Sequence, residues 1–373
     1  MMKNKRGLIF CVFLLLIFLP ICANAEEEDL RQGIVKNSGA ERIYDILDED
    51  SKDLLSGVGI DGAWFDVENA EKQNYLQMLS AVLNEKIHAP MKAAAMIFLI
   101  IILCKIFSSF ENSEVRKVSD MAAILCVGAV LLPPAINLID YSRGVAQGTS
   151  VFLLTSGPIY GALLAATGRL KSAASLAGMT IAVGNAVPVL LSGVIIPMLN
   201  MFLGLAVTAS VSTVPIKRAT DGIYSFAKWS LSILITIFFA VVAIQSTINH
   251  SMDEVSVKTV KFVTSSAIPV IGGTISDSLS MIQGSVQVIR SGIGAFGILA
   301  AIAIFLPLFA EAVVWIVVCF TGETVAELFE MPQIAAFLAQ VMNVIKMILA
   351  AMVSLFAVCV VCTSMVILMG VSG

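Results

Sequence analysis

The sequence predicts an all-α membrane protein with about eight or nine transmembrane helices, and three observations support this prediction. Hydrophobic residues make up 58% of the 373-residue chain and charged residues only 13%, and the mean hydropathy is +0.93. Soluble domains are much less apolar. Because a hydrocarbon core of about 30 Å requires about 20 apolar residues per helix, the chain after residue 90 has room for these crossings. The apolar blocks are interrupted by glycine and proline and show no alternating strand pattern, which favours helices.

The first 25 residues have the features of a cleavable secretory signal. They begin with a basic region, continue with an apolar core and end with small residues at Ala23 and Ala25. We expect cleavage before Glu26. An uncleaved anchor is the alternative, since signal and anchor differ mainly in apolar length. Lipidation of Cys22 is disfavoured because a bulky residue precedes it.

Residues 26–90 form an acidic segment, which we expect to be helical and extracytoplasmic. Cleavage removes three of the 23 basic residues and leaves 20 against 27 acidic ones, a net charge of −7. Residues 26–90 contain 15 acidic and six basic residues and no cysteine. The charge disfavours nucleic acid or anionic lipid as a partner. The segment is too short for a large core and should pack on the membrane domain, residues 91–373, or on a partner.

Basic residues predict the orientation of the first spans. The first span, residues 91–110, leads to Lys105, Arg116 and Lys117, which indicate a cytoplasmic loop. Spans at 121–139 and 149–167 would then cross outward and return to a cytoplasmic loop at Arg169 and Lys171. The next forty residues should form two short helices that turn near residues 188–193.

The topology of the last third depends on residues 262–289. If they cross once, Arg290 is cytoplasmic, residues 294–320 return outward, and the C-terminus is inside. The acidic loop would then be external; its carboxylates are Glu323, Glu327 and Glu330. If residues 262–289 only dip into the membrane, everything after them inverts. We favour the crossing on the evidence of Arg290.

Residues 274–290 form the most informative stretch, because they combine an apolar stripe with a polar face at helical spacing. A break is expected at Pro269, Gly272 and Gly273, and Thr274 followed by Asp277 suggests a capped helix start. A polar face at membrane depth must be shielded from lipid by protein or water. The candidate polar or lining residues are Ser276, Asp277, Ser280, Gln283, Gln287 and Arg290.

Two further charges fall inside apolar blocks. Glu311 is costly in a membrane unless it faces a cavity or a partner. Its candidate structural partner is Lys346; the alternative is a relay or pore residue, and the structural interpretation is favoured. Cys359 and Cys362 have redox or metal spacing, but we interpret them as two small buried hydrophobes.

No motif for catalysis, a phosphate loop or a metal site is found, so no enzyme activity, cofactor or metal is expected. Two motifs with small residues at about four-residue spacing are more informative, because such residues let helix backbones approach closely. They predict close helix packing; their members are Gly157, Gly161 and Ala165, and Gly294, Gly297 and Ala301.

Several stretches together resemble the stage III sporulation protein AE family of endospore-forming Firmicutes. These are AIPVIGGTISDSLSMIQGSVQVIRSGIG, GPIYGALLAATG and VGNAVPVLLSGVIIPMLN, combined with a signal and an acidic external segment. The resemblance covers nearly the whole chain, and the first stretch is the most specific. The family has no assigned catalytic residues.

The resemblance implies a multi-pass protein of the mother-cell membrane that surrounds the forespore. Its expected partners are the other proteins of the stage III sporulation A operon, including a secretion-type ATPase and a ring-forming protein. The expected function is that of a membrane subunit in a channel or secretion-like complex required for late forespore gene expression. Two alternatives stay open: a scaffold that recruits partners without lining a pore, and a stand-alone secondary transporter. No convincing internal repeat supports a transporter.

Overall fold

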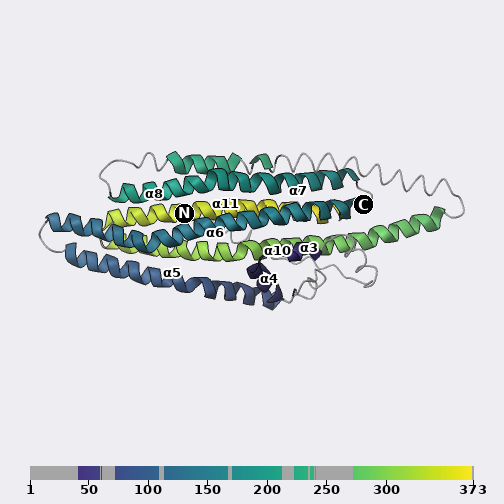
Figure 1. Cartoon of the computed structure of the whole chain (residues 1–373). Helices are drawn as coiled ribbons and strands as arrows, with labels where there is room; N and C mark the ends of the chain where they lie inside the picture. The colour runs from purple at the N-terminus through teal and green to yellow at the C-terminus, as the bar shows by residue number, and fades with distance from the viewer. Residues whose placement is uncertain are drawn as a thin grey trace, which may run out of the picture.

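The protein is an elongated bundle of long helices in a computed structural model (Figure 1). The structure describes residues 41–58, 60, 72–108, 113–166, 170–211, 222–233, 236–238, 240 and 272–371. The signal residues Ala23 and Ala25 and the predicted break residue Pro269 lie outside this part. The side chains of residues 272–291 are also outside it. No strand occurs among the described residues, and the all-α membrane class is confirmed.

Five described segments are long and apolar enough to cross a membrane, and a shorter apolar helix spans Gly222–Phe238. The long helices are α5 (Lys72–Ser108), α6 (Ser113–Ala166), α10 (Gly272–Leu328) and α11 (Pro332–Val371). The fifth segment joins α7 (Leu170–Leu190), the π-helix η2 (Leu191–Ile195) and α8 (Ile196–Val211). At 1.5 Å per residue, α10 is about 85 Å long, more than twice the thickness of a bilayer core.

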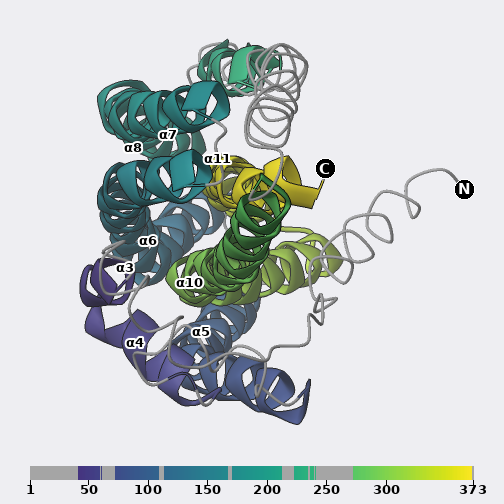
Figure 2. The same cartoon turned by 90° about the vertical axis from the view of Figure 1, so that its right-hand side faces the viewer.

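The helices pack as two antiparallel pairs with further helices beside them. α10 packs on α11, and α6 packs on α7; α5 lies against α10 and α6, and α8 lies against α11 and α6. Figure 2, viewed along the bundle, shows α10 between α11 and α5, with α7 and α8 beyond α6. The largest fully buried side chains include Tyr160, Phe152, Phe305 and Phe337.

The N-terminal helices α3 (Glu41–Asp45) and α4 (Glu49–Ser56) pack on the side of this bundle. The ring of Tyr44 lies 6.5 Å from that of Phe296 on α10. Leu55 and Ile60 are buried, next to Leu299 and Ile302 of α10. The expected boundary at residue 90 falls within α5, which continues through Pro90.

Three expected breaks are wrong, because the structure has continuous helices there. α6 joins the expected second and third spans through residues 140–148. The expected turn near residues 188–193 is instead the junction of α7 and η2, where the chain continues in the same direction (Figure 1). α10 passes through Arg290 without reversing. Each helix therefore extends through positions at which the sequence suggested a membrane surface.

These continuous helices also correct the expected sidedness of two loops. Lys171, at the start of α7, lies at the end of the bundle opposite to Lys105, near the end of α5, so these two basic positions are not on the same side. The acidic turn between α10 and α11 lies at the same end as Lys105, whose Nζ is 3.3 Å from Oε2 of Glu330. The C-terminal end of α11 lies at the other end (Figure 1). The expectation of opposite sides for Lys105 and Glu330 is therefore wrong.

Candidate functional site

The predicted polar face lies on the first part of α10. This part is helical from Gly272 onward, so Ser276, Gln283 and Arg290 share one face by their seven-residue spacing. The part extends beyond the ends of α6 and α11 (Figure 1). Gly272 and Gly273, predicted as the break, belong to the described helix. Because the side chains here are outside the described part, the contacts of the six candidate residues stay predictions.

Glu311 lies near the middle of the bundle, where α10 faces α5. Its side chain is half-buried, and Trp315 lies one turn later on the same helix. The favourable charge near Glu311 is Lys86 of α5. Lys346, the partner predicted from sequence, interacts instead with Glu323 of α10. Each of the two charges thus lies within electrostatic range of a charge of opposite sign, but a different one from that expected.

Other charged residues gather at the level of Glu311, and we call this set the charged girdle. Lys86 forms a 2.9 Å ion pair with Glu85, and Arg143 lies 3.6 Å from Asp140 on α6. Tyr141, half-buried between them, interacts electrostatically with acids of the N-terminal segment, of α5 and of α10. The girdle is made up of Asp48, Asp50, Glu85, Lys86, Asp140, Arg143 and Glu311.

The electrostatic interaction between Lys86 of α5 and Glu311 of α10 can be tested by substitution of both residues. Lys86→Met and Glu311→Gln should each lower the stability of the bundle, and the double variant should recover part of the loss. Because Lys86 and Glu311 are both only partly buried, solvent screens their interaction and the coupling should be about 0.5 kcal/mol. The measurement is a double-mutant cycle of thermal unfolding in detergent. Additive losses would show that the two residues do not interact.

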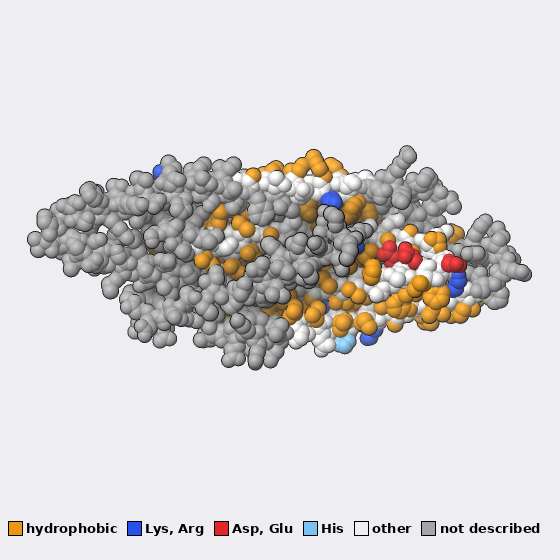
Figure 3. Space-filling model, turned by 180° about the vertical axis from the view of Figure 1, so that it is seen from behind, with side chains coloured by type: hydrophobic (Ala, Val, Ile, Leu, Met, Phe, Trp, Pro, Cys, Tyr) orange, Lys and Arg blue, Asp and Glu red, His pale blue; other side chains and the backbone are white. Residues whose placement is uncertain are grey.

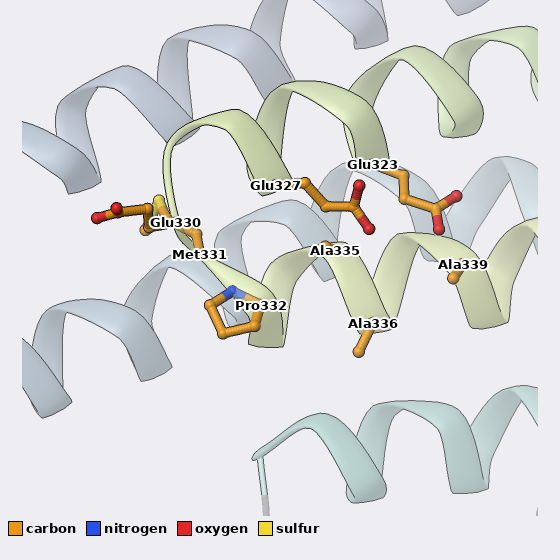
Figure 4. Close-up of a pocket in the computed structure, with 8 residues that line it drawn as sticks. All are labelled: Glu323, Glu327, Glu330, Met331, Pro332, Ala335, Ala336 and Ala339. Atoms are coloured by element: carbon orange, nitrogen blue, oxygen red, sulfur yellow. The ribbon is translucent and has the colours of Figure 1, made fainter.

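The second polar feature is the acidic turn between α10 and α11. Glu330 has a positive φ of 56°, uncommon for a residue other than glycine, and forms the ion pair with Lys105. A groove of about 320 Å³ lies beside the turn. In Figure 4 the side chains of Glu323 and Glu327 point toward the helix with Ala335 and Ala339, whereas Glu330 points away. Figure 3 shows acidic side chains among hydrophobic ones toward one end of the described surface.

The two predicted small-residue motifs lie at close helix crossings, which confirms their packing role. Gly157 and Gly161 of α6 lie against α7: a Cβ at 161 would be 2.9 Å from Cβ of Ala177. Gly294 and Gly297 of α10 lie against α11: a Cβ at 294 would be 2.5 Å from Cγ1 of Ile367. Cys359 and Cys362 of α11 are fully buried, as two small core residues would be.

The hydroxyl of Tyr160 fills the space that Gly297 leaves open. Tyr160 and Ser156 are fully buried and lie one turn apart on α6. The geometry of their hydroxyl groups is not that of a hydrogen bond, so both oxygens lack a partner among the described residues. The sequence analysis does not predict the contact between Tyr160 and Gly297, because the two residues are more than 130 positions apart in the chain.

The contact between the Tyr160 hydroxyl and Gly297 predicts that one substitution can compensate for another. Gly297→Ala should lower the melting temperature, since its methyl group would overlap the Tyr160 hydroxyl. Tyr160→Phe should be nearly neutral alone, because it removes an unpartnered hydroxyl. In the double variant, the phenylalanine ring removes the overlap with the hydroxyl, and part of the loss should disappear; the rest reflects Thr363, whose Cγ2 would lie 3.1 Å from the added Cβ. Thermal unfolding of the four proteins measures this, and a double variant no better than Gly297→Ala would contradict it.

The described residues contain no group of three His, Cys, Asp or Glu side chains that could hold a metal ion. The geometry instead combines a long bundle, a charged girdle and an acidic end. These features can position charged groups against a membrane and offer surfaces to other proteins.

Comparison with known proteins identifies the family. The family model described as stage III sporulation protein AE matches residues 65–371. The chain belongs to the stage III sporulation protein AE family. Similarity to the curated stage III sporulation protein AE of Bacillus subtilis (strain 168) amounts to 24% identity over 237 residues, which are 62% of this chain and 59% of the relative. No solved structure matches.

Membership in this family implies a role in sporulation, and the family is not a known enzyme family. The matched region includes all five long apolar segments and the acidic turn, together with the girdle residues of α5, α6 and α10. The protein is therefore a membrane protein, and the region that it shares with its family is the bundle of long helices.

Proposed function

We propose that this protein is a membrane subunit of a secretion-like channel complex that connects the mother cell with the forespore. It would act in the mother-cell membrane around the forespore, with other proteins of the stage III sporulation A operon. These include a secretion-type ATPase and a ring-forming protein. The observation that supports this best is the family match over residues 65–371, the whole helical bundle.

The first part of α10 is the candidate lining or docking element. It is one continuous helix with the rest of α10 and extends beyond the packed ends of α6 and α11. Its spacing places hydroxyl and amide residues on one face. A helix with such a face can border an aqueous path or bind a polar surface of a partner.

Cysteine substitutions at Ser276, Ser280, Gln283 and Gln287 test the lining role. In assembled complexes from sporulating cells, a charged maleimide should modify these positions, and a bulky adduct should reduce a late forespore reporter. The matched control is Gly178→Cys on α7, which is exposed and has nothing within 4 Å of its Cβ position. Modification there should leave the reporter unchanged. If no α10 position reacts while loop controls do, the lining role fails and a scaffold is the better explanation.

Co-purification tests membership in the complex. A tagged full-length protein from sporulating cells should retain the operon's other membrane proteins after mild solubilisation. Loss of spores and of the forespore reporter on deletion, restored by the wild-type gene, would support the role. Normal spore formation without the gene would contradict it.

A further inference from the structure

We propose that the bilayer surrounds only the half of the bundle between the charged girdle and the acidic turn, and that the other half stands outside the membrane. This inference does not depend on the proposed channel role. Three observations support it. They are the positions of exposed large apolar side chains on the described helices, the positions of the charged residues along these helices, and the packing of the N-terminal segment.

α10 shows the change in exposure within a single helix. On the stretch 292–310 no side chain is exposed. Directly after Glu311 an exposed apolar stripe begins, with Val313, Val317 and Phe320. The residues recur every three or four positions, so they lie on one face. This face has the character of a surface in contact with lipid, whereas the stretch before Glu311 has that of a protein core.

On α5 and α6 most exposed large apolar side chains lie on the acidic-turn side of the girdle, whereas α7, beside the other half of α6, exposes Leu170, Ile181, Val189 and Leu190. On α6, Met121, Leu125 and Ile136 are exposed before the girdle, and Val151 is the exposed large hydrophobic residue described after it. α5 contributes further exposed side chains to the same half: Met91, Met96, Leu99, Ile102, Leu103, Ile106 and Phe107. Scattered apolar residues are normal on any protein surface, but a continuous apolar belt indicates a membrane or a partner.

The length of this half fits a bilayer core, although α6 is also free of charge from Gly144 to its end at Ala166, so exposure and the N-terminal segment, and not length, distinguish the two halves. α6 has no charged residue between Asp120 and Asp140, and the 19 residues between them span about 28 Å, close to the hydrocarbon thickness of about 30 Å. Lys92 and Lys105 on α5 lie nearer together, and their long side chains can extend toward the two surfaces. Lys346, inside this half, lies within electrostatic range of Glu323, which lowers the cost of a charge in a membrane.

The N-terminal segment excludes the bilayer from the other half on its side of the bundle. α3 and α4 cover α10 between Phe296 and Leu306 through buried apolar residues. Their outer surface exposes Asp45, Asp48, Glu49, Asp50 and Asp53. Five carboxylates facing hydrocarbon would be very costly. On this face, the half of the bundle before Glu311 of α10 therefore lies in water, on the side of the membrane where the N-terminal segment lies.

Thiol labelling of the full chain in lipid nanodiscs tests the proposal. Cys126 of α6 is exposed and lies in the charge-free stretch, whereas the other described cysteines are buried. Val151→Cys in a Cys126→Ser background places a thiol on the same helix beyond the girdle. We expect a charged maleimide to modify position 151 at least about tenfold faster than Cys126, because the thiolate forms and reacts in water. A lipid-soluble maleimide should modify both.

Three results would overturn the proposal. If the charged maleimide modified neither position, both halves would lie in lipid. If it modified both at the same rate, the exposed apolar side chains of α5, α6 and α10 would lie in water. If the lipid-soluble reagent also failed at Cys126, or a bismaleimide linked two copies there, a second chain rather than lipid would cover the belt. Nitroxide lipids supply an independent measurement: they should quench a fluorophore at 126 and leave one at 151 unaffected.

Discussion

Gly161→Val is expected to destabilise the α6–α7 pair by about 2–3 kcal/mol. A Cβ at this position would lie 2.9 Å from Cβ of Ala177 and 3.2 Å from the carbonyl oxygen of Ala173. Neither atom can rotate away, because one is attached directly to the backbone and the other belongs to it. The two helices must separate, and the contacts along their crossing are lost. The measurement is the melting temperature of the purified full chain in detergent.

Gly178→Val provides the matched control for this prediction. Gly178 is on α7, is exposed, and has nothing within 4 Å of its Cβ position. Both substitutions replace a helical glycine and gain the same helix propensity, so their difference isolates the crossing. Equal melting temperatures for the two variants would show that α6 and α7 do not approach closely at Gly161.

The sequence predicts the helices of this fold well, because apolar composition and small-residue spacing are local properties. It also predicts that Gly161 and Gly297 lie at helix crossings, since close approach requires small residues wherever the partner helix lies. Its errors concern where helices end. Polar residues at 140–148 were expected to mark a loop, on the assumption that every apolar block of about 20 residues is one crossing.

The charged girdle explains why that assumption fails. Asp140 and Arg143 lie 3.6 Å apart on a continuous helix, near acids of three other elements. These partners come from residues 48–50, 85 and 311, so the spacing of α6 alone contains no sign of them. The pairing of Glu311 with Lys86 was missed for the same reason. Predicting it requires knowing that α5 and α10 lie side by side.

The proposed position of the bilayer also changes the meaning of the polar face on α10. Residues 274–290 were predicted to need shielding from lipid, because they were assigned to a crossing. If the half of the bundle before Glu311 stands outside the membrane, this face meets water without cost. The same argument places Glu311 near the membrane surface and not at its centre, where an unpaired charge would be far more costly.

Val317→Asp is expected to impair membrane insertion strongly, whereas Val151→Asp should have little effect. The two valines are 53% and 48% exposed, on α10 and α6, so side-chain type and exposure are closely matched. Under the proposed bilayer position, a carboxylate at position 317 would face hydrocarbon, at a cost of about 2.5–3.5 kcal/mol. A carboxylate at position 151 would face water, where a surface substitution changes stability by about 0.5 kcal/mol or less. The measurement is the amount of folded protein in the carbonate-resistant membrane fraction.

Val317→Ala separates the charge from the loss of the side chain and should behave like the wild type. If both aspartate variants fail to insert, the bilayer surrounds both halves and the water-exposed half does not exist. If both insert normally, Val317 does not face lipid, and the belt is covered by protein. The expected difference between the two valines follows if the girdle marks a membrane surface, because the two side chains are matched in type and in exposed fraction.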